Sequence, residues 1–228
     1  MSEWLTYRPE DFLLFSPRTY WRMFELQNEA YWPLPVLTLA LGGIVTFLAA
    51  RGSGRAIRGA AVILAVVWFF VAYTFLWNRY ASINWAMNYV APAFALQALL
   101  LLLIAFRRAV AVQSRGIAAW IGTLLLAFAT VGVPLMAPLH GRDRATSEVF
   151  GIAPDPTVIA TLGFLLLIRG RFVWALYPIP VLWTLLSGVT LYTMGERQAW
   201  IVFLALLLAA VAVVTLRLDL KRQRLDPG

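Results

Sequence analysis

Seven long apolar runs follow one another between residues 32 and 216, and they constrain the fold more than any other feature of the sequence. Most of the runs hold 18 to 23 residues, and none contains an aspartate, glutamate, lysine, arginine or histidine. A helix of about 20 residues, rising ~1.5 Å per residue, crosses the ~30 Å hydrocarbon core of a bilayer. The runs are, in order, 32–50, 59–77, 85–106, 117–137, 156–168, 172–194 and 199–216. We therefore expect an all-α, polytopic membrane protein with seven transmembrane helices.

The composition behind these runs separates the chain from soluble domains and from most metalloproteins. The sequence is 61% hydrophobic and only 13% charged, and a soluble domain of this length has too little interior to bury so much apolar surface. It contains no cysteine, which excludes disulfides, thiolate metal sites and iron–sulfur clusters. A single histidine, His140, is too few for a multi-histidine zinc site or a bis-histidine haem. We expect no cofactor and no metal.

Basic residues gather in every second connection between the runs. The loops after the first, third and fifth runs, together with the C-terminal tail, carry 12 basic and two acidic residues. The other side carries seven basic and nine acidic residues. By the positive-inside rule, the C-terminus is cytoplasmic and the N-terminus lies outside. The net charge of +8 therefore reflects threading through a membrane, and we expect no nucleic-acid partner.

The segment before the first run carries an amphipathic helical pattern. Ser16 and Pro17 predict an N-cap and a first helical position. Charged residues then share one helical face and mostly aromatic residues the other, namely Arg18, Arg22, Glu25 and Glu29 against Tyr20, Met23, Phe24 and Tyr31. The pattern predicts a helix in the membrane interface, in contact with lipids, with a protein-binding surface as the alternative. The chain thus divides into an extracytoplasmic segment (1–31), a transmembrane domain (32–216) and a basic cytoplasmic tail (217–228).

Prolines and one glutamine interrupt the apolar runs. Pro92 lies inside the third run, and Pro178 and Pro180 lie in the sixth, so we expect kinks at both places. Pro180 lacks the N–H that would bond to the carbonyl of Leu176 and leaves that carbonyl free. Gln97, in the third run, is expected to hydrogen-bond a neighbouring helix or to line a cavity.

Polar side chains gather in two of the predicted outer loops. The stretch 139–157 is the longest polar interruption of the chain, and the loop at 77–89 adds an arginine and asparagines on the same side. We take eight residues of these loops as candidates for ligand binding: Arg79, Asn84, Asn88, His140, Arg142, Asp143, Glu148 and Asp155. Their spacing matches no metal-ligand, serine-hydrolase or zincin motif, so we expect no enzyme. A solvated loop held by salt bridges is the alternative to a ligand site.

The fifth run, 156–168, is short for a full crossing. Its 13 residues would form a helix of roughly 20 Å, against the ~30 Å of hydrocarbon in a bilayer. Asp155 and Pro156 predict its N-cap and first position, and Arg169 its cytoplasmic end. The chain at 150–154 would descend below the outer surface as irregular backbone, which is tolerated where it is buried or lines a wet cavity. We expect an outward-open vestibule with this helix N-terminus as its floor; helix tilt or local bilayer thinning is the alternative.

Three segments carry a resemblance to a known family. They read SPRTYWRMFELQNEAYWP (16–33), WNRYASINWAMNYVAPAFALQALLLL (77–102) and EVFGIAPDPTVIATLGFLLL (148–167). Together they resemble an uncharacterised bacterial family of small multi-pass membrane proteins, whose members are often labelled as permeases of the major facilitator type. The resemblance extends over essentially the whole chain and implies a bacterial inner membrane. It implies no activity, substrate or site.

Two functions follow from these features. The first is a non-enzymatic membrane component, such as an accessory subunit, a scaffold or a ligand binder. Its outward-facing vestibule would take an anionic or polar guest at the positive end of a helix dipole, and the N-terminal segment or outer loops would meet a protein partner. The alternative is a small-solute permease or channel, with a path lined by Asn88, Gln97, Ser187 and Thr190. The charge-free runs favour the first, because ionisable residues inside a membrane are typical of ion-coupled carriers.

Overall fold

The computed structural model describes residues 14–107, 111–113 and 116–225. Within these residues the fold is almost entirely helical, which confirms the all-α prediction. The α-helices are α1 (Pro17–Ala30), α2 (Leu34–Arg51), α3 (Gly54–Phe70), α4 (Met87–Phe106), α5 (Ile117–Ala127), α6 (Val133–Leu139), α7 (Pro154–Leu165), α8 (Pro178–Thr193) and α9 (Gln198–Leu225). The beginning of the predicted N-terminal segment (1–13) and the end of the predicted tail (226–228) lie outside the described residues.

Several helices continue through turns of a different pitch. A π-helical segment, Val71–Trp77, extends α3, and a second, Phe128–Gly132, joins α5 to α6. Three 3₁₀ turns lie at Tyr80–Ser82, Arg144–Thr146 and Arg171–Leu176. The two π-helical segments leave the helices unbroken. α3 with its extension, and α5 with α6, therefore each form one stretch long enough to cross a membrane.

Six helical stretches among the described residues are long and apolar enough to cross a membrane. They are Leu34–Arg51, Gly54–Ser82, Met87–Phe106, Ile117–Leu139, Arg171–Thr193 and Gln198–Arg217. Large apolar side chains remain exposed on their outward surfaces; Phe47 is 61% exposed, Phe69 59% and Trp120 80%. A water-soluble protein rarely leaves so much apolar surface open, so these surfaces fit contact with lipid tails.

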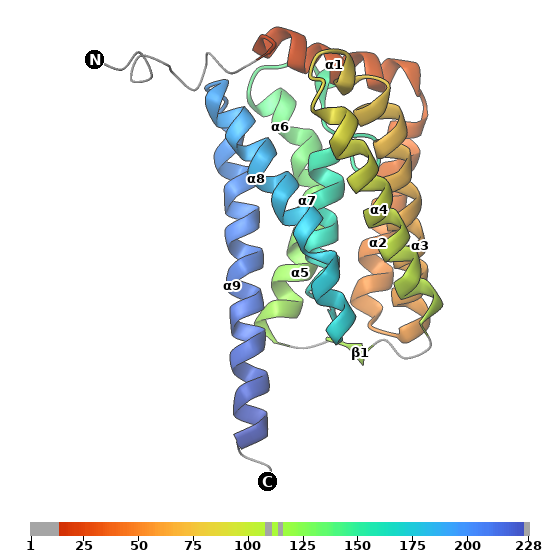
Figure 1. The fold of residues 1–228 in the computed structure, drawn as a ribbon, viewed down its shortest axis with the longest axis vertical. Helices are drawn as coiled ribbons and strands as arrows, with labels where there is room; N and C mark the ends of the chain where they lie inside the picture. Colours follow the sequence, from red (N-terminus) through yellow and green to blue (C-terminus); the bar gives the residue numbers. More distant parts are fainter. Residues whose placement is uncertain (1–13, 108–110, 114–115, 226–228) are drawn as a thin grey trace, which may run out of the picture.

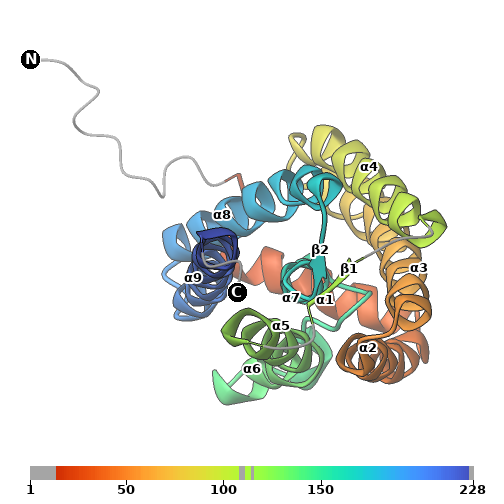
Figure 2. The ribbon, with the colours of Figure 1, turned by 90° about the horizontal axis from the view of Figure 1, so that it is seen from below.

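The fifth apolar run, 156–168, forms most of α7, a helix that the other helices surround. Seen along the bundle, α7 lies at the centre of the ring made by the remaining long helices (Figure 2). It contacts α3, α5, α8 and α9, and every one of its residues is buried. Its 12 residues span about 18 Å at ~1.5 Å per residue, which is too short for a full crossing. The chain that leads into it, 147–153, is also buried throughout, which is the environment that irregular backbone needs at depth.

A pair of glycines brings α5 and α7 into close contact. A Cβ atom added to Gly163 would lie 2.5 Å from the carbonyl oxygen of Gly122. One added to Gly122 would lie 2.6 Å from the carbonyl oxygen of Gly163. Since a real Cβ does not approach a backbone oxygen so closely, the two helices can cross at this distance only with glycine at both positions.

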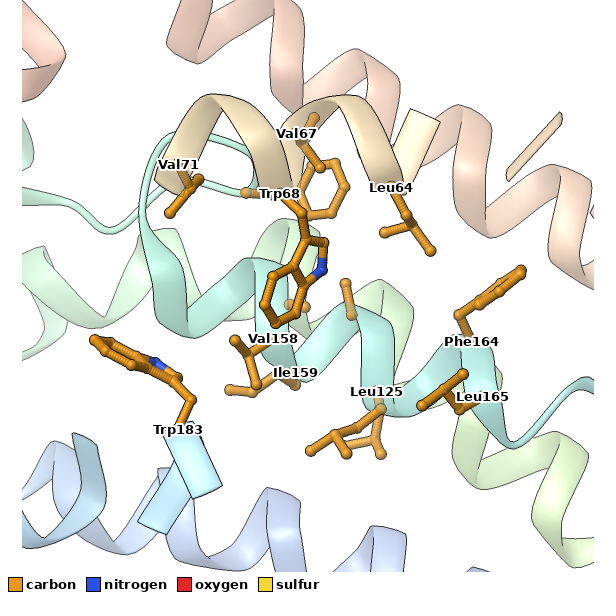
Figure 3. Close-up of a cluster of buried hydrophobic side chains, with 14 of the residues drawn as sticks. Leu64, Val67, Trp68, Val71, Leu125, Val158, Ile159, Phe164, Leu165 and Trp183 are labelled. Atoms are coloured by element: carbon orange, nitrogen blue, oxygen red, sulfur yellow. The ribbon is translucent and has the colours of Figure 1, made fainter. Parts of the chain in front are cut away.

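Aromatic side chains pack around the upper half of α7. Figure 3 shows Trp68 of α3 and Trp183 of α8 reaching toward it. The Trp68 indole donates a hydrogen bond to Thr161 Oγ1 at 2.7 Å. The Trp68 and Phe94 ring centroids are 4.3 Å apart, and those of Phe94 and Trp183 are 5.0 Å apart. The core is therefore filled by a helix and by large rings.

The sixth run changes its helical pitch at its prolines. The 3₁₀ turn Arg171–Leu176 leads through Tyr177 into α8, which begins at Pro178, within one helical stretch, Arg171–Thr193; the angle of the predicted kink stays a prediction. The pitch changes because two prolines two positions apart lack the N–H groups needed inside a helix but suit a first turn. The carbonyl of Leu176 is left free, as expected, and accepts a hydrogen bond from Gln97 Nε2 at 3.1 Å. Pro92 lies inside α4, which continues as a helix on both sides.

The two ends of the bundle differ in structure. α1 lies across one end, while the C-terminus and β1 lie at the other (Figure 1). At that second end, β1 (Ala111–Val112) pairs antiparallel with β2 (Ile168–Arg169) and so ties the chain after α4 to the exit of α7. The helix α9 continues to Leu225, so most of the predicted basic tail is helical.

Candidate functional site

The helix α1 forms a cover over one end of the bundle. It begins as predicted, with Ser16 as N-cap accepting from the Thr19 N–H and Pro17 at the first position. Its aromatic face is buried against the other helices, so this face packs on protein, and contact of α1 with lipids stays a prediction. Tyr20 and Phe24 are 3% and 2% exposed. The sequence pattern identified the apolar face correctly but not the surface that it meets.

Hydrogen bonds hold α1 in this position. The Trp21 indole donates to Glu196 Oε1 at 2.8 Å. Gln27 donates to Thr74 Oγ1 at 3.0 Å and accepts from Arg79 Nε at 2.8 Å. Asn28 Nδ2 donates to the carbonyl oxygens of Ala145 and Ser147 at 2.8 and 2.9 Å. The cover is thus joined to three separate parts of the chain: the segment 71–86, the loop 140–153 and the connection between α8 and α9.

A cavity of about 690 Å³ lies between α1 and the two polar loops. It is lined by four arginines and two acidic residues, with polar and apolar side chains between them: Arg18, Arg22, Arg79, Arg142, Glu25, Asp143, Thr19, Ser82, Thr146, Trp21, Met23, Leu26 and Ile83. The charges leave an excess of two positive charges in the lining. A guanidinium group presents several N–H donors in a plane and binds carboxylates and phosphates well, so the lining suits an anionic guest.

Arg142 joins this cavity to the interior. Its guanidinium carbon lies 3.3 Å from the centre of a Trp21 ring, and its Nη2 donates to Gln198 Oε1 at 2.5 Å. Burial lowers the pKa of Arg142, while the negative charges of Glu148 and Glu196 act in the opposite direction. Two of its buried nitrogens, Nε and Nη1, have no hydrogen-bond partner among the described residues. These two nitrogens of Arg142 therefore remain available as hydrogen-bond donors.

Glu148 is linked to Arg142 through Gln198, which bonds to both, and is 2% exposed. Its Oε2 accepts a short hydrogen bond from Gln198, and its Oε1 has no partner among the described residues. Burial raises the pKa of Glu148 to about 8, and the negative charge of Asp155 adds to this effect while Arg142 opposes it. The carboxyl group thus takes up a proton far more readily than an exposed glutamate does.

Asp155, at 3% exposure, is held by α8 and not by its own helix. It accepts hydrogen bonds from Trp183 Nε1 at 2.7 Å and from Ser187 Oγ at 2.6 Å. The predicted N-cap role is wrong, because α7 begins at Pro154 and Ala153 is its N-cap. Pro154 and Pro156 have no N–H to satisfy, so the first turn has little need of a side-chain cap. The Asp155 carboxylate instead links α7 to α8 through its two hydrogen bonds.

The structure brings together some of the predicted binding residues and separates others. Arg79, Arg142 and Asp143 line the cavity, and Glu148 and Asp155 are buried within the bundle. The remaining three do not line it. Asn84 accepts from the Ala86 N–H at 3.1 Å, Asn88 is exposed, and His140 Nδ1 lies 2.8 Å from the Met136 carbonyl oxygen at the end of α6.

Other residues of this end were not predicted. Trp21, Gln198 and Glu196 connect Arg142 and Glu148 to α1 and α9, and Trp183 with Ser187 binds Asp155. Trp21 and Glu196 are 175 positions apart in the sequence, and no local pattern indicates such a pairing. A buried indole usually donates its N–H to an acceptor. This general tendency is the one feature that points to Trp21 and Trp183.

Comparison with known proteins gives a family for this chain. The model of the family of unknown function DUF6064 matches residues 18–224. The chain belongs to this family. In this DUF6064 chain the match begins within α1 and ends within α9, so the cover, the cavity and the buried carboxylates all lie inside it. No curated protein and no solved structure matches the chain.

Proposed function

We propose that this DUF6064 protein is a multi-pass protein of a bacterial inner membrane that binds a small anionic ligand at its outer end. α7, together with the buried chain on either side of it (147–153 and 166–168), makes one pass in addition to the six long helices; the N-terminus lies outside and the C-terminus is cytoplasmic. The exposed apolar surfaces of the six long helices support placement in a bilayer. The basic connections support the orientation, since positively charged loops remain on the cytoplasmic side.

The observation that carries the binding function is the arginine-lined cavity under α1. Its four guanidinium groups exceed the two carboxylates, and one of the carboxylates, Glu25, is paired with Arg22. The other, Asp143, accepts from the Ala145 N–H at 2.8 Å. The cavity therefore replaces the expected vestibule floored by the N-terminus of α7, since its described lining does not include Asp155.

A binding role is favoured over an enzymatic one by the same lining. Both of its carboxylates are engaged, one in an ion pair and one in capping a 3₁₀ turn, so neither is poised to move a proton. The protein would act as a ligand-binding component of the membrane, either alone or as an accessory subunit. A partner protein that contacts α1 would then detect whether a ligand occupies the cavity.

A small-solute permease is the second candidate, and the buried carboxylates favour it. Glu148 and Asp155 lie inside the bundle, where ionisable groups often belong to proton or ion pathways. The expected path does not favour it. Gln97 bonds the Leu176 carbonyl and Ser187 bonds Asp155. Asn88 is exposed, and Thr190, which is half-buried, donates to the Leu186 carbonyl of its own helix. α7 occupies the position where such a path would run.

Binding of phosphate and citrate to the protein in mild detergent tests the proposed function. We expect a saturable rise in melting temperature for at least one of these anions, with affinity reduced about tenfold in Arg18→Gln and in Arg79→Gln, because each removes a charge-assisted hydrogen-bond donor. Arg144→Gln is the matched control, since Arg144 is exposed in the same loop system and is not part of the lining. Equal affinities in all three variants, or no saturable effect, would reject the site; uptake of solute by liposomes would support the permease.

A further inference from the structure

A second cavity opens between α8 and α9 on the side of the bundle. It has a volume of about 370 Å³, and its lining contributes no polar surface. Side chains of α7, α8, α9 and the 3₁₀ turn before α8 form its walls and floor, among them Leu162 of α7, Tyr177 just before α8, Val181 of α8, and Ala210 and Val213 of α9. An apolar groove of this kind accepts a hydrocarbon chain at no cost in unsatisfied hydrogen bonds.

A positive charge lies at one end of this groove. The guanidinium carbon of Arg217 is 4.4 Å from the ring centre of Trp174, and Trp174 belongs to the groove lining. Trp174 stacks on Tyr177 at 5.5 Å and is 41% exposed. Tryptophan, tyrosine and arginine together are the side chains that gather at the boundary between hydrocarbon and headgroups. The groove therefore runs from the interior of the bundle to an aromatic and cationic rim.

The position of this rim agrees with the end of the bundle that holds the basic connections. Trp174 and Tyr177 follow β2, and α9 passes this end of the bundle before it terminates (Figure 1). Arg217 places a positive charge at this rim, so an anionic headgroup is favoured over a zwitterionic one.

We propose that this α8–α9 groove binds one anionic phospholipid, with an acyl chain along the apolar walls and the phosphate beside Arg217. This site rests on the proposed membrane placement but not on the arginine-lined cavity, which lies at the opposite end of the bundle and is formed by other residues.

Native mass spectrometry of the detergent-purified protein tests this proposal, with phosphatidylglycerol and phosphatidylethanolamine of identical acyl chains as the probes. The wild-type protein is expected to retain one phosphatidylglycerol in preference to phosphatidylethanolamine. Arg217→Gln should reduce that preference about fivefold, as expected for one arginine near a lipid surface. Ala210→Phe, which fills the groove from an exposed position, should reduce the binding of both lipids.

Two matched variants make the result decisive. Arg51→Gln removes another arginine that lies over a ring, at 5.7 Å from that of Phe47, and Val211→Phe enlarges an exposed neighbour of Ala210 that is not part of the lining. Both should bind lipid as the wild type does. The proposal is overturned if Arg217→Gln behaves as Arg51→Gln, if Ala210→Phe behaves as Val211→Phe, or if a lipid-free dimer covers the groove.

Discussion

Two buried carboxyl groups, Glu148 and Asp155, lie in the covered end of the bundle and are held in different ways. Both oxygens of Asp155 accept hydrogen bonds, from Trp183 and Ser187, whereas one oxygen of Glu148 has no partner among the described residues. An unsatisfied buried acceptor costs about 1–3 kcal/mol, and protonation relieves part of this cost by removing the charge. Of the two groups, Glu148 is therefore the one whose protonation we expect to make this end of the protein sensitive to pH.

We predict that the stability of the protein falls as pH rises from about 5 to about 8. The pKa of Glu148 is raised from 4.5 to about 8, so in this range the folded chain holds a proton that the unfolded chain has released. Stabilisation from this group is complete below the unfolded pKa and is lost as pH passes the folded one. Glu148→Gln, which keeps the shape without the charge, should flatten the dependence of melting temperature on pH; each kcal/mol corresponds to about 2–4 °C for a chain of this size.

Glu29→Gln provides the comparison for this experiment, because Glu29 is exposed on α1. Its variant should retain the slope of the wild type. A Glu148→Gln protein with an unchanged slope would show that Glu148 ionises normally in the folded protein.

At the scale of elements, the close crossing of α5 and α7 determines how deeply α7 can sit. The two glycines place each helix against the other's backbone, so a methyl group at either position must push backbone atoms apart. Overpacking of this kind typically costs about 1–3 kcal/mol and more where backbone is the obstacle. α7 has no exposed side into which it could shift, since all of its residues are buried.

Gly163→Ala is therefore predicted to destabilise the protein by roughly 3 kcal/mol or to prevent its folding. Gly43→Ala is the matched control: it lies in α2, and an added Cβ would have nothing within 4 Å. Because alanine favours helix over glycine, Gly43→Ala should be neutral or stabilising by up to ~1 kcal/mol. Thermal unfolding in detergent measures both, and equal melting temperatures would contradict the close crossing.

The elements also show what the sequence could predict. The length of the apolar runs located the long helices, and Ser16-Pro17 located the start of α1. Periodicity reports which face of a helix is apolar but not whether lipid or protein covers it, so the contact surface of α1 was missed. In the same way, Asp155 before Pro156 matched an N-cap pattern, while its actual partner, Trp183, is 28 positions away and leaves no local signal.

At the scale of the whole molecule, its two ends have different chemistry. One end carries α1, the arginine-lined cavity and the buried carboxylates, and the other carries the basic connections and the lipid-binding groove's cationic rim. Such a division suits a protein that receives a ligand on one side of a membrane and is anchored by lipid headgroups on the other. The central α7 runs between the two ends: Asp155, near its start, is one of the buried carboxyl groups, and Leu162 borders the α8–α9 groove.

The orientation of the two ends is predicted from the charge of the connections and is directly testable, because the chain contains no cysteine. Glu29→Cys places a thiol on the exposed side of α1, and Gly54→Cys places one at the start of α3, where an added Cβ meets open space. In intact cells whose inner membrane is exposed, an impermeant thiol reagent should label Glu29→Cys and leave Gly54→Cys unlabelled until the membrane is permeabilised. The reverse pattern would place the arginine-lined cavity in the cytoplasm, and labelling of both in sealed membranes would argue against a bilayer between them.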